Sequence, residues 1–356
     1  MMERLKILLL VCLSGLMVAC VKHEVAKPSV CYFGSSVCRG EGADSLRGYA
    51  YQVGEQLPEG WSYTNLSVNS NNTYDLLARF DDILTTDAKY VVIGLSLGNE
   101  HLHEAGEAAV LSYTENMQTL IRMLRNLGKV PIVTNNYTRA DFNEVDYRDI
   151  QRVNLGMQQW DVPTINLCGV IDDGAGHWAE GYWNGTDIYH PNMAGHTEMM
   201  TAFPPSLFEA LEQKKPMPER PSQPSAPAPD MREKVVKVSF EPEGLLHSYT
   251  LSYMLGDTTY TVVHSHARQL TWHYKNAQCV SQAADSVVRK SFAVEGRQLH
   301  DLFFYRSALN PLEVKALSDG GMLRSSLDIY APIFFGNKVK DDNLAQSLTQ
   351  IKSVVY

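Results

Sequence analysis

Polar side chains in three widely separated blocks have the types and spacing needed for nucleophilic catalysis. Ser36 follows the apolar run 29–33, so its hydroxyl would be presented at a turn between a strand and a helix. Asp187 precedes His190 by three residues, which lets the carboxylate accept a hydrogen bond from one ring nitrogen while the other nitrogen faces a nucleophile. Between these blocks, Asn99 offers an amide donor suited to an oxyanion hole. Together the blocks indicate serine hydrolase chemistry.

The elements that would position these blocks alternate between two kinds of segment. Short apolar runs predict strands, and longer amphipathic stretches predict helices. The predicted strands are 29–33, 63–68, 90–95, 130–134 and 164–168, and the predicted helices lie around 45–57, 74–84, 104–127, 147–159 and 194–212. Such alternation predicts a parallel sheet covered on both faces. Because ligands of these sheets bind at the carboxyl ends of the strands, residues just after each strand matter most.

The three blocks in this order resemble the SGNH, or GDSL-type, hydrolases, and the resemblance covers about residues 29–212. It implies a flavodoxin-like three-layer α/β/α domain that cleaves esters without a cofactor. It also implies that Ser36 is the nucleophile, that His190 is the general base and then the acid, and that Asp187 orients His190. The oxyanion donors that it implies are Asn99 and the backbone amides of Ser36 and Ser70.

Two departures from the family pattern bear on this assignment. Ser35 stands where the family usually has an Asp, so the chain offers two candidate nucleophiles, although Ser36 occupies the family position. Ser70 falls where the oxyanion Gly is expected. If that turn requires a positive φ, a Ser there carries strain that Gly would not, or the neighbouring Asn69 or Asn71 adopts that conformation instead.

Other residues compete for functional roles. The segment 94–98 fits the G-x-S-x-G nucleophile elbow of α/β-hydrolases. That fold would need more strands before the elbow, and an upstream oxyanion loop, than the short stretch from Cys20 can supply. We therefore expect Ser96 to pack at the end of a strand. His101 and His103, with the acidic pair 172–173, lack a metal-binding framework, and no metal is expected.

Aromatic residues precede the Asp-His pair in a Gly-rich loop. Trp178 and Trp183 could stack on a sugar ring, which makes them candidate substrate-binding residues, or they could cap the core. The sequence is compatible with both alternatives. His196, a few residues after His190, is expected to form a hydrogen bond within the last helix of this domain.

The N-terminus indicates export. Arg4 and Lys6 precede the apolar run 7–19, which is too short to span a bilayer as a mature helix and is typical of a signal peptide. The segment 16–20 resembles a lipobox, which predicts cleavage and lipidation at Cys20 and a membrane-anchored lipoprotein facing the periplasm or the cell surface. The alternative is an ordinary cleaved signal with a chance Cys20. Four further cysteines would make disulfides feasible in an oxidising compartment.

A Pro-rich segment divides the remaining chain. We predict a signal peptide over 1–20, the hydrolase domain over 27–213, a linker over 214–230, and a smaller all-β sandwich over 231–356. The stretch 302–314 resembles LamG-like, concanavalin A-type domains. That resemblance implies carbohydrate binding, with an accessory role that positions the first domain as the alternative.

Composition limits the partners. The chain has 356 residues, 44% hydrophobic and 20% charged, with a net charge of -9, which disfavours a nucleic-acid-binding surface. We therefore expect a surface-anchored or secreted serine esterase that removes O-acetyl or other short acyl groups from carbohydrate. The alternatives are a lipid- or thioester-cleaving hydrolase of the same family, and a carbohydrate-binding surface protein whose hydrolase domain has decayed.

Overall fold

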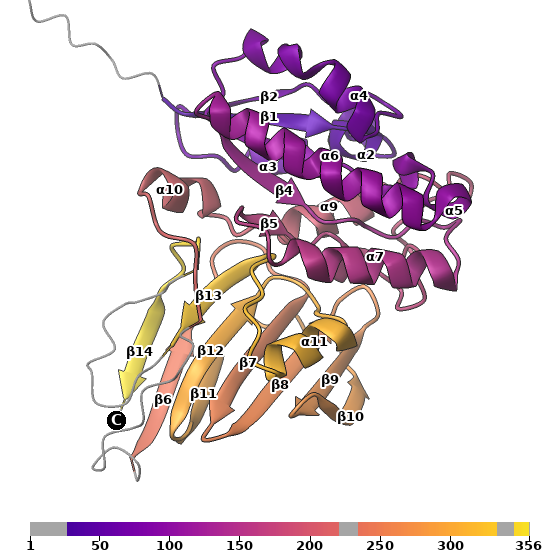
Figure 1. The fold of residues 1–356 in the computed structure, drawn as a ribbon. Helices are drawn as coiled ribbons and strands as arrows, with labels where there is room; N and C mark the ends of the chain where they lie inside the picture. The colour runs from indigo at the N-terminus through magenta and orange to yellow at the C-terminus, as the bar shows by residue number, and fades with distance from the viewer. Residues whose placement is uncertain (1–26, 221–233, 333–344, 356) are drawn as a thin grey trace, which may run out of the picture.

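The computed structural model describes residues 27–220, 234–332 and 345–355. The predicted signal peptide with Cys20 and most of the predicted linker lie outside the described residues. The described residues on either side of the linker form two domains, which are drawn one above the other in Figure 1.

Five parallel strands form the central sheet of the first domain, in the order β2-β1-β3-β4-β5. The strands are β1 (Ser29–Gly34), β2 (Ser62–Asn65), β3 (Tyr90–Gly94), β4 (Val130–Thr134) and β5 (Thr164–Ile165). This order confirms the predicted flavodoxin-like sheet. The strand order reverses between β1 and β3, so a crevice is expected at their carboxyl ends.

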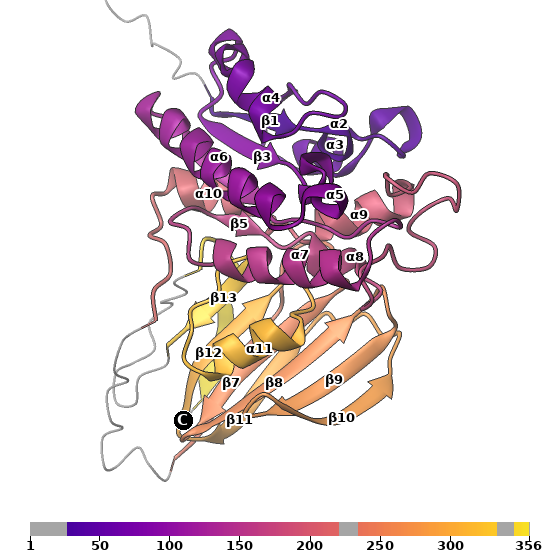
Figure 2. The ribbon, with the colours of Figure 1, turned by 45° about the vertical axis from the view of Figure 1, so that its right-hand side comes forward.

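Alternating side chains of the strands enter two separate cores, one on each face of the sheet. In β1, Val30 and Tyr32 belong to one core, and Cys31 and Phe33 belong to the other. The first core is completed by α3 (Tyr49–Gly54), α9 (Met193–Thr201) and α10 (Leu207–Glu212), and the second by α4 (Thr73–Ala78), α6 (Glu107–Asn126) and α7 (Glu144–Met157). The predicted three layers are therefore present (Figures 1 and 2).

Two antiparallel sheets form the second domain. The larger contains, in spatial order, β10 (Gln278–Ala284), β9 (Leu270–Lys275), β8 (Thr258–Ser265), β7 (Tyr249–Leu255), β12 (Leu299–Tyr305) and β13 (Leu327–Ala331). The smaller contains β11 (Phe292–Arg297), β6 (Val235–Phe240) and β14 (Ile351–Val355). One apolar core joins the two sheets, and α11 (Pro311–Ser318) covers the other face of the larger sheet. The second domain is thus all-β with one added helix.

Hydrogen bonds join the two domains directly. The Ser326 amide donates to the Thr164 carbonyl over 2.9 Å, and the Ala308 amide donates to the Gly169 carbonyl over 3.0 Å. Ser325 and Thr164 also share a buried hydroxyl hydrogen bond of 2.6 Å. Helix α7 of the first domain lies against α11 of the second (Figure 2). The second domain therefore packs along the β5 edge of the first domain.

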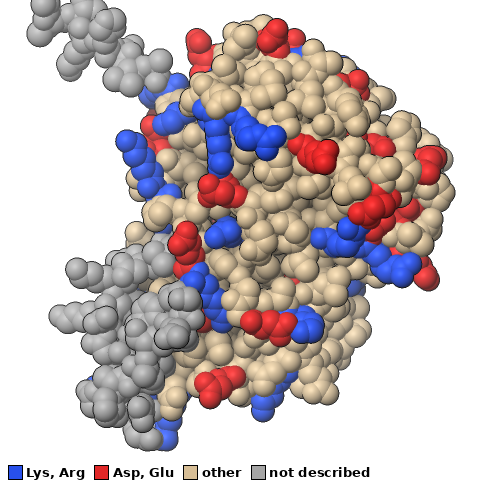
Figure 3. Space-filling model, in the orientation of Figure 1, with Lys and Arg blue, Asp and Glu red and all other residues tan. Residues whose placement is uncertain are grey.

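Charged side chains of both signs lie on the surface, and the described cysteines are unpaired. On the face shown in Figure 3, acidic and basic side chains are interspersed. The four cysteines in the described part of the chain, Cys31, Cys38, Cys168 and Cys279, are all free thiols. Among the described residues, no helix is both long and apolar enough to cross a membrane.

Candidate active site

A pocket of about 390 Å³ lies at the carboxyl ends of the parallel strands. It gathers Ser36, Ser70, Asn99 and His190, which the sequence places in four separate blocks. Its lining residues are Ser36, Val37, Ser70, Asn72, Gly98, Asn99, His101, His103, Glu104, Tyr137, Arg139, Asp141, Phe142, Tyr189 and His190.

Ser36 is presented to this pocket by a tight turn after β1. It is the first residue of the short helix α2 (Ser36–Arg39), so its amide has no acceptor within that helix. The turn depends on Gly34, because a Cβ there would lie 2.1 Å from the carbonyl oxygen of Gly94. Ser35 is fully buried and does not line the pocket, and its hydroxyl has no hydrogen-bond partner among the described residues. Of the two adjacent serines, only Ser36 therefore faces the pocket.

His190 is oriented by Asp187, as their spacing predicts. The Asp187 Oδ2 atom lies 2.7 Å from the His190 Nδ1 atom, and Asp187 Oδ1 accepts the amide hydrogen of Tyr189 over 3.0 Å. Partial burial opposes the charge on Asp187, but the hydrogen bonds from His190 and Tyr189 outweigh it and lower the pKa of Asp187. Asp187 therefore stays ionised and leaves Nε2 of His190 available. No hydrogen bond joins Ser36 and His190 directly, and such pairs are often looser before substrate binds.

Two polar groups that line the same pocket as Ser36 could bind an oxyanion. Ser70 has φ +63 in a turn that the Asn71 amide closes by donating to the Val68 carbonyl over 3.3 Å. The positive φ therefore falls on Ser70 itself, at a turn position that favours Gly, and not on Asn69 or Asn71. Asn99 donates one amide hydrogen from Nδ2 to the Asn71 carbonyl over 2.9 Å, which fixes its side chain and leaves its second hydrogen available.

His196 connects the segment after Ser36 with the helix that follows His190. Its Nε2 atom lies 2.8 Å from the Glu41 carbonyl, and its Nδ1 atom accepts the Tyr49 amide hydrogen over 3.2 Å. Burial lowers the pKa of His196 to about 4, so the ring is neutral and donates from Nε2. The expectation that His196 bonds within its own helix is wrong, because both partners lie in the segment after Ser36.

Gly42 lies at the same junction. With φ +87, it lets the segment after Ser36 approach the chain at His190 and Pro191 so closely that a Cβ would lie 2.1 Å from the Pro191 carbonyl oxygen. The Ser36 and His190 blocks are thus held together by close backbone packing.

Three other candidate residues, Trp178, Trp183 and Ser96, lie in or against the interior of the first domain. Trp178 is only 3% exposed and stacks on Tyr137 with ring centroids 5.6 Å apart. Trp183 packs against the same core, and neither Trp is among the residues that line the pocket. The ring of Trp178 therefore completes the core, Trp183 packs against it partly buried, and the pocket includes neither of these two predicted substrate-binding residues. Ser96 is also buried, and it accepts the Gly98 amide hydrogen at the start of a 3-10 helix.

Two pocket residues that follow β4, Tyr137 and Arg139, belong to none of the motifs recognised in the sequence. Arg139 forms two hydrogen bonds with Asp141, of 2.9 and 2.5 Å. Its guanidinium group lies 4.6 Å from the ring centroid of Tyr189, which is half exposed at the pocket. The rule that residues after strands form the site could have identified Tyr137 and Arg139, since both come shortly after Thr134.

Comparison with known proteins agrees with this geometry. Residues 32–197 match the model of the GDSL-like lipase/acylhydrolase family, a range that includes all five residues of the implied catalytic and oxyanion set. A search of the curated proteins found no match.

Solved structures are similar over about half of this chain. A catalytic mutant of an acetylxylan esterase from Geobacillus stearothermophilus is 16% identical, with 50% of this chain and 92% of that chain covered and a TM-score of 0.41. A lipase from a goat rumen metagenome is 16% identical, with 49% and 95% covered and a TM-score of 0.43. A protein described as lipolytic and of the G-D-S-L family, from Desulfitobacterium hafniense, is 15% identical, with 49% and 97% covered and a TM-score of 0.42.

The family match, the parallel sheet and the grouping of the motif residues in one pocket lead to the same assignment. Residues 32–197, within the first domain of this chain, are similar to the GDSL-like lipase/acylhydrolase family.

Proposed function

We propose that the protein is a serine ester hydrolase in which Ser36 is the nucleophile. One observation carries the proposal: Ser36 shares a pocket with His190, whose other ring nitrogen is 2.7 Å from the Asp187 carboxylate. This combination of nucleophile, base and orienting group is what covalent serine catalysis requires.

The reaction would proceed in two halves. Ser36 Oγ attacks the acyl carbonyl while His190 Nε2 takes its proton, and the same proton then passes to the departing alcohol. The amides of Ser36 and Ser70 and the Nδ2 group of Asn99 donate to the oxyanion in each tetrahedral intermediate. A water molecule, deprotonated by His190, attacks the acyl-enzyme, which releases the acid and restores Ser36. Asp187 stabilises the imidazolium that forms in each half. The proposed reaction requires no cofactor.

For the substrate, we propose a short acyl ester on a carbohydrate. The pocket presents the Arg139–Asp141 pair and His103, which are polar groups that can bind sugar hydroxyls. Tyr189 offers a half-exposed aromatic face at the same pocket, a role that the sequence analysis gave to Trp178 and Trp183. A long-chain lipid substrate would instead need an extended apolar groove, and most of the lining side chains are polar.

We further propose export of the protein and anchoring through acyl chains at Cys20. This proposal rests on the N-terminal sequence pattern alone. The second domain would bind carbohydrate or position the first domain on the substrate. The interspersed surface charge and the net charge of -9 give no reason to propose a nucleic-acid partner.

Acyl-chain selectivity tests the proposed substrate class. Purified protein should hydrolyse acetyl and propionyl aryl esters faster than long-chain esters, and should release acetate from acetylated polysaccharide. A preference for long chains would favour a lipid substrate. Binding of the polysaccharide with no hydrolysis of any ester would favour the decayed-enzyme alternative.

A further inference from the structure

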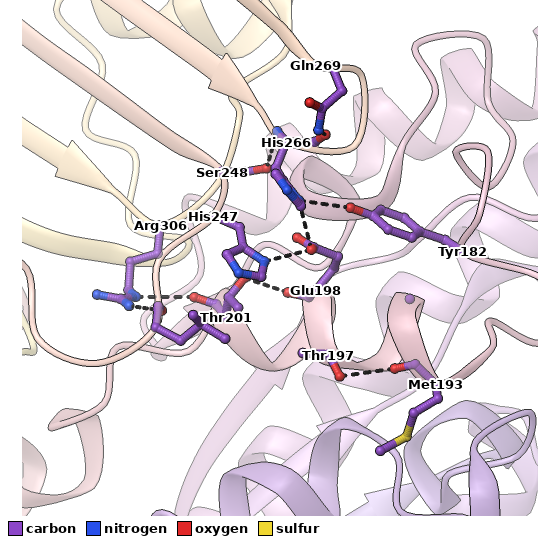
Figure 4. Close-up of polar contacts among 12 residues, drawn as sticks. Tyr182, Met193, Thr197, Glu198, Thr201, His247, Ser248, His266, Gln269 and Arg306 are labelled. Atoms are coloured by element: carbon purple, nitrogen blue, oxygen red, sulfur yellow. Dashed lines mark hydrogen bonds and ion pairs between the residues drawn. The ribbon is translucent and has the colours of Figure 1, made fainter. Parts of the chain in front are cut away.

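A carboxylate and two imidazoles converge where the two domains meet. Glu198 comes from α9 of the first domain, whereas His247 and His266 come from segments that flank β7 and β8 of the second (Figure 4). The Nδ1 atoms of His247 and His266 lie 2.6 and 2.9 Å from the same oxygen, Oε1 of Glu198. One potential ligand atom from each of the three residues lies within 4.8 Å of the others.

We propose that Glu198, His247 and His266 bind a divalent transition-metal ion, with Zn²⁺ as the best fit. Two imidazole nitrogens and one carboxylate oxygen are a donor set that Zn²⁺ uses in proteins, whereas Ca²⁺ and Mg²⁺ prefer oxygen ligands.

The dimensions of the cluster fit such an ion. With bonds of about 2.0 to 2.1 Å and tetrahedral angles, ligand atoms on Zn²⁺ lie about 3.3 Å apart. The two Nδ1 atoms are closer than this to Glu198 Oε1, at 2.6 and 2.9 Å. Replacing their Nδ1 protons with the ion therefore requires the His247 nitrogen to move away from Oε1 by about 0.7 Å and the His266 nitrogen by about 0.4 Å. The His247 and His266 rings are 4.6 Å apart between centroids, which allows both to face one ion.

Burial of Glu198 gives an independent reason to expect a ligand. The Glu198 side chain is only 4% exposed, and its second oxygen, Oε2, has no hydrogen-bond partner among the described residues. A buried polar atom without a partner is unfavourable, and a cation beside the carboxylate would supply the missing interaction.

Tyr182 lies beside the cluster. Its hydroxyl is 3.2 Å from Nδ1 of His266 (Figure 4). A fourth ligand could be the Tyr182 oxygen itself or a water held by it, since tetrahedral Zn²⁺ sites take four ligands.

The position of the cluster gives the metal a structural role. The carbonyl of Tyr182 accepts the amide hydrogen of Asn192 over 2.8 Å, which closes the base of the loop that carries Asp187 and His190. A metal held by Glu198 from one domain and two histidines from the other would tie the second domain to this loop base. Its binding free energy would then stabilise the docking of the two domains.

Metal binding to the purified full chain tests the proposal. We expect about one Zn²⁺ per chain by mass spectrometry of the isolated protein or after titration of chelator-treated protein, and a rise in melting temperature on Zn²⁺ addition. Co²⁺ in its place should give the visible absorption of a tetrahedral site. His247→Gln and His266→Gln should each weaken Zn²⁺ binding by about 100-fold or more, since even residues that only support ligands typically contribute 10- to 100-fold.

A matched control is His273→Gln, because His273 is an exposed residue of β9 outside the cluster. This variant should bind Zn²⁺ as the original protein does. The proposal is overturned if the original protein neither contains nor binds Zn²⁺ and Co²⁺, in which case the cluster is only a hydrogen-bonded ion pair. It is also overturned if His247→Gln and His266→Gln bind Zn²⁺ no more weakly than His273→Gln, which would mean adventitious binding elsewhere. The Co²⁺ spectrum of the original protein decides the matter even if a variant fails to fold.

Discussion

Replacing Gly42 with alanine should impair catalysis although Gly42 does not line the pocket. The new Cβ would lie 2.1 Å from the Pro191 carbonyl oxygen and 3.0 Å from the His190 Cβ, and real Cβ contacts are essentially never under 3.0 Å. The two segments must therefore separate by about 1 Å, a displacement that can reduce the rate about 100-fold. The left-handed backbone at Gly42, φ +87, adds about 1 to 2 kcal/mol of strain for any residue with a Cβ.

Gly181→Ala separates these two effects. Gly181 has nearly the same φ, +85, but a Cβ there meets no atom within 4 Å. Both variants should lose about 1 to 2 kcal/mol of unfolding free energy from backbone strain, measured by urea unfolding. Only Gly42→Ala should also lose about 100-fold in kcat/KM for an acetyl aryl ester. Equal kcat/KM in the two variants would refute the idea that packing at Gly42 positions His190.

Three further predictions concern Asp187, Ser70 and Glu313. Asp187→Asn should lower kcat by roughly 10³-fold or more, because an amide no longer selects the His190 tautomer with hydrogen on Nδ1; steady-state kinetics measure this. Ser70→Gly should raise the unfolding free energy by about 1 kcal/mol by relieving the φ of +63, with kcat unchanged because the amide remains; a large fall in kcat would instead assign a role to the hydroxyl. Burial raises the pKa of Glu313 from 4.5 to about 7, so the folded protein keeps a proton that the unfolded chain has lost. Stability should therefore fall between pH 4.5 and 7, by about 3 kcal/mol at 1.36 kcal/mol per pH unit. Urea unfolding of Glu313→Gln should show a shallower pH dependence than the original protein; parallel profiles would contradict this.

The architecture of the first domain could be predicted because its signals are local. Apolar runs such as 90–95 and 130–134 are too short for helices and alternate with amphipathic stretches, which restricts the chain to a doubly wound sheet. The predicted strand 164–168 was too long, because pairing ends at Ile165 and helix α8 (Cys168–Ile171) begins shortly afterwards. Apolar residues continue across that boundary, so the pattern could not show it.

The candidate site was partly predictable for a similar reason. Ser36, Asn99 and His190 follow strands or precede a helix within recognisable motifs, and the structure brings them to one pocket. Whether an aromatic ring faces the pocket or the core depends on tertiary packing, so the sequence could not decide between the two roles of Trp178.

The cluster at the domain junction could not be inferred from the sequence. Glu198 is separated by 49 residues from His247 and by 68 from His266. No short motif encodes such a grouping, since it depends on how the second domain packs against α9. Similarly, the partners of His196 lie about 150 residues away and are backbone groups, which leave no signal in residue type.

The most direct test of the central claim is ester hydrolysis by Ser36→Ala and Ser35→Ala, each compared with the original protein. Only Ser36 lines the pocket, whereas Ser35 is fully buried without a hydrogen-bond partner among the described residues. We predict that Ser36→Ala loses roughly 10³-fold or more of kcat/KM for an acetyl aryl ester, and that Ser35→Ala retains activity. Equal loss in both variants, or no loss in either, would contradict the assignment of Ser36 as the nucleophile.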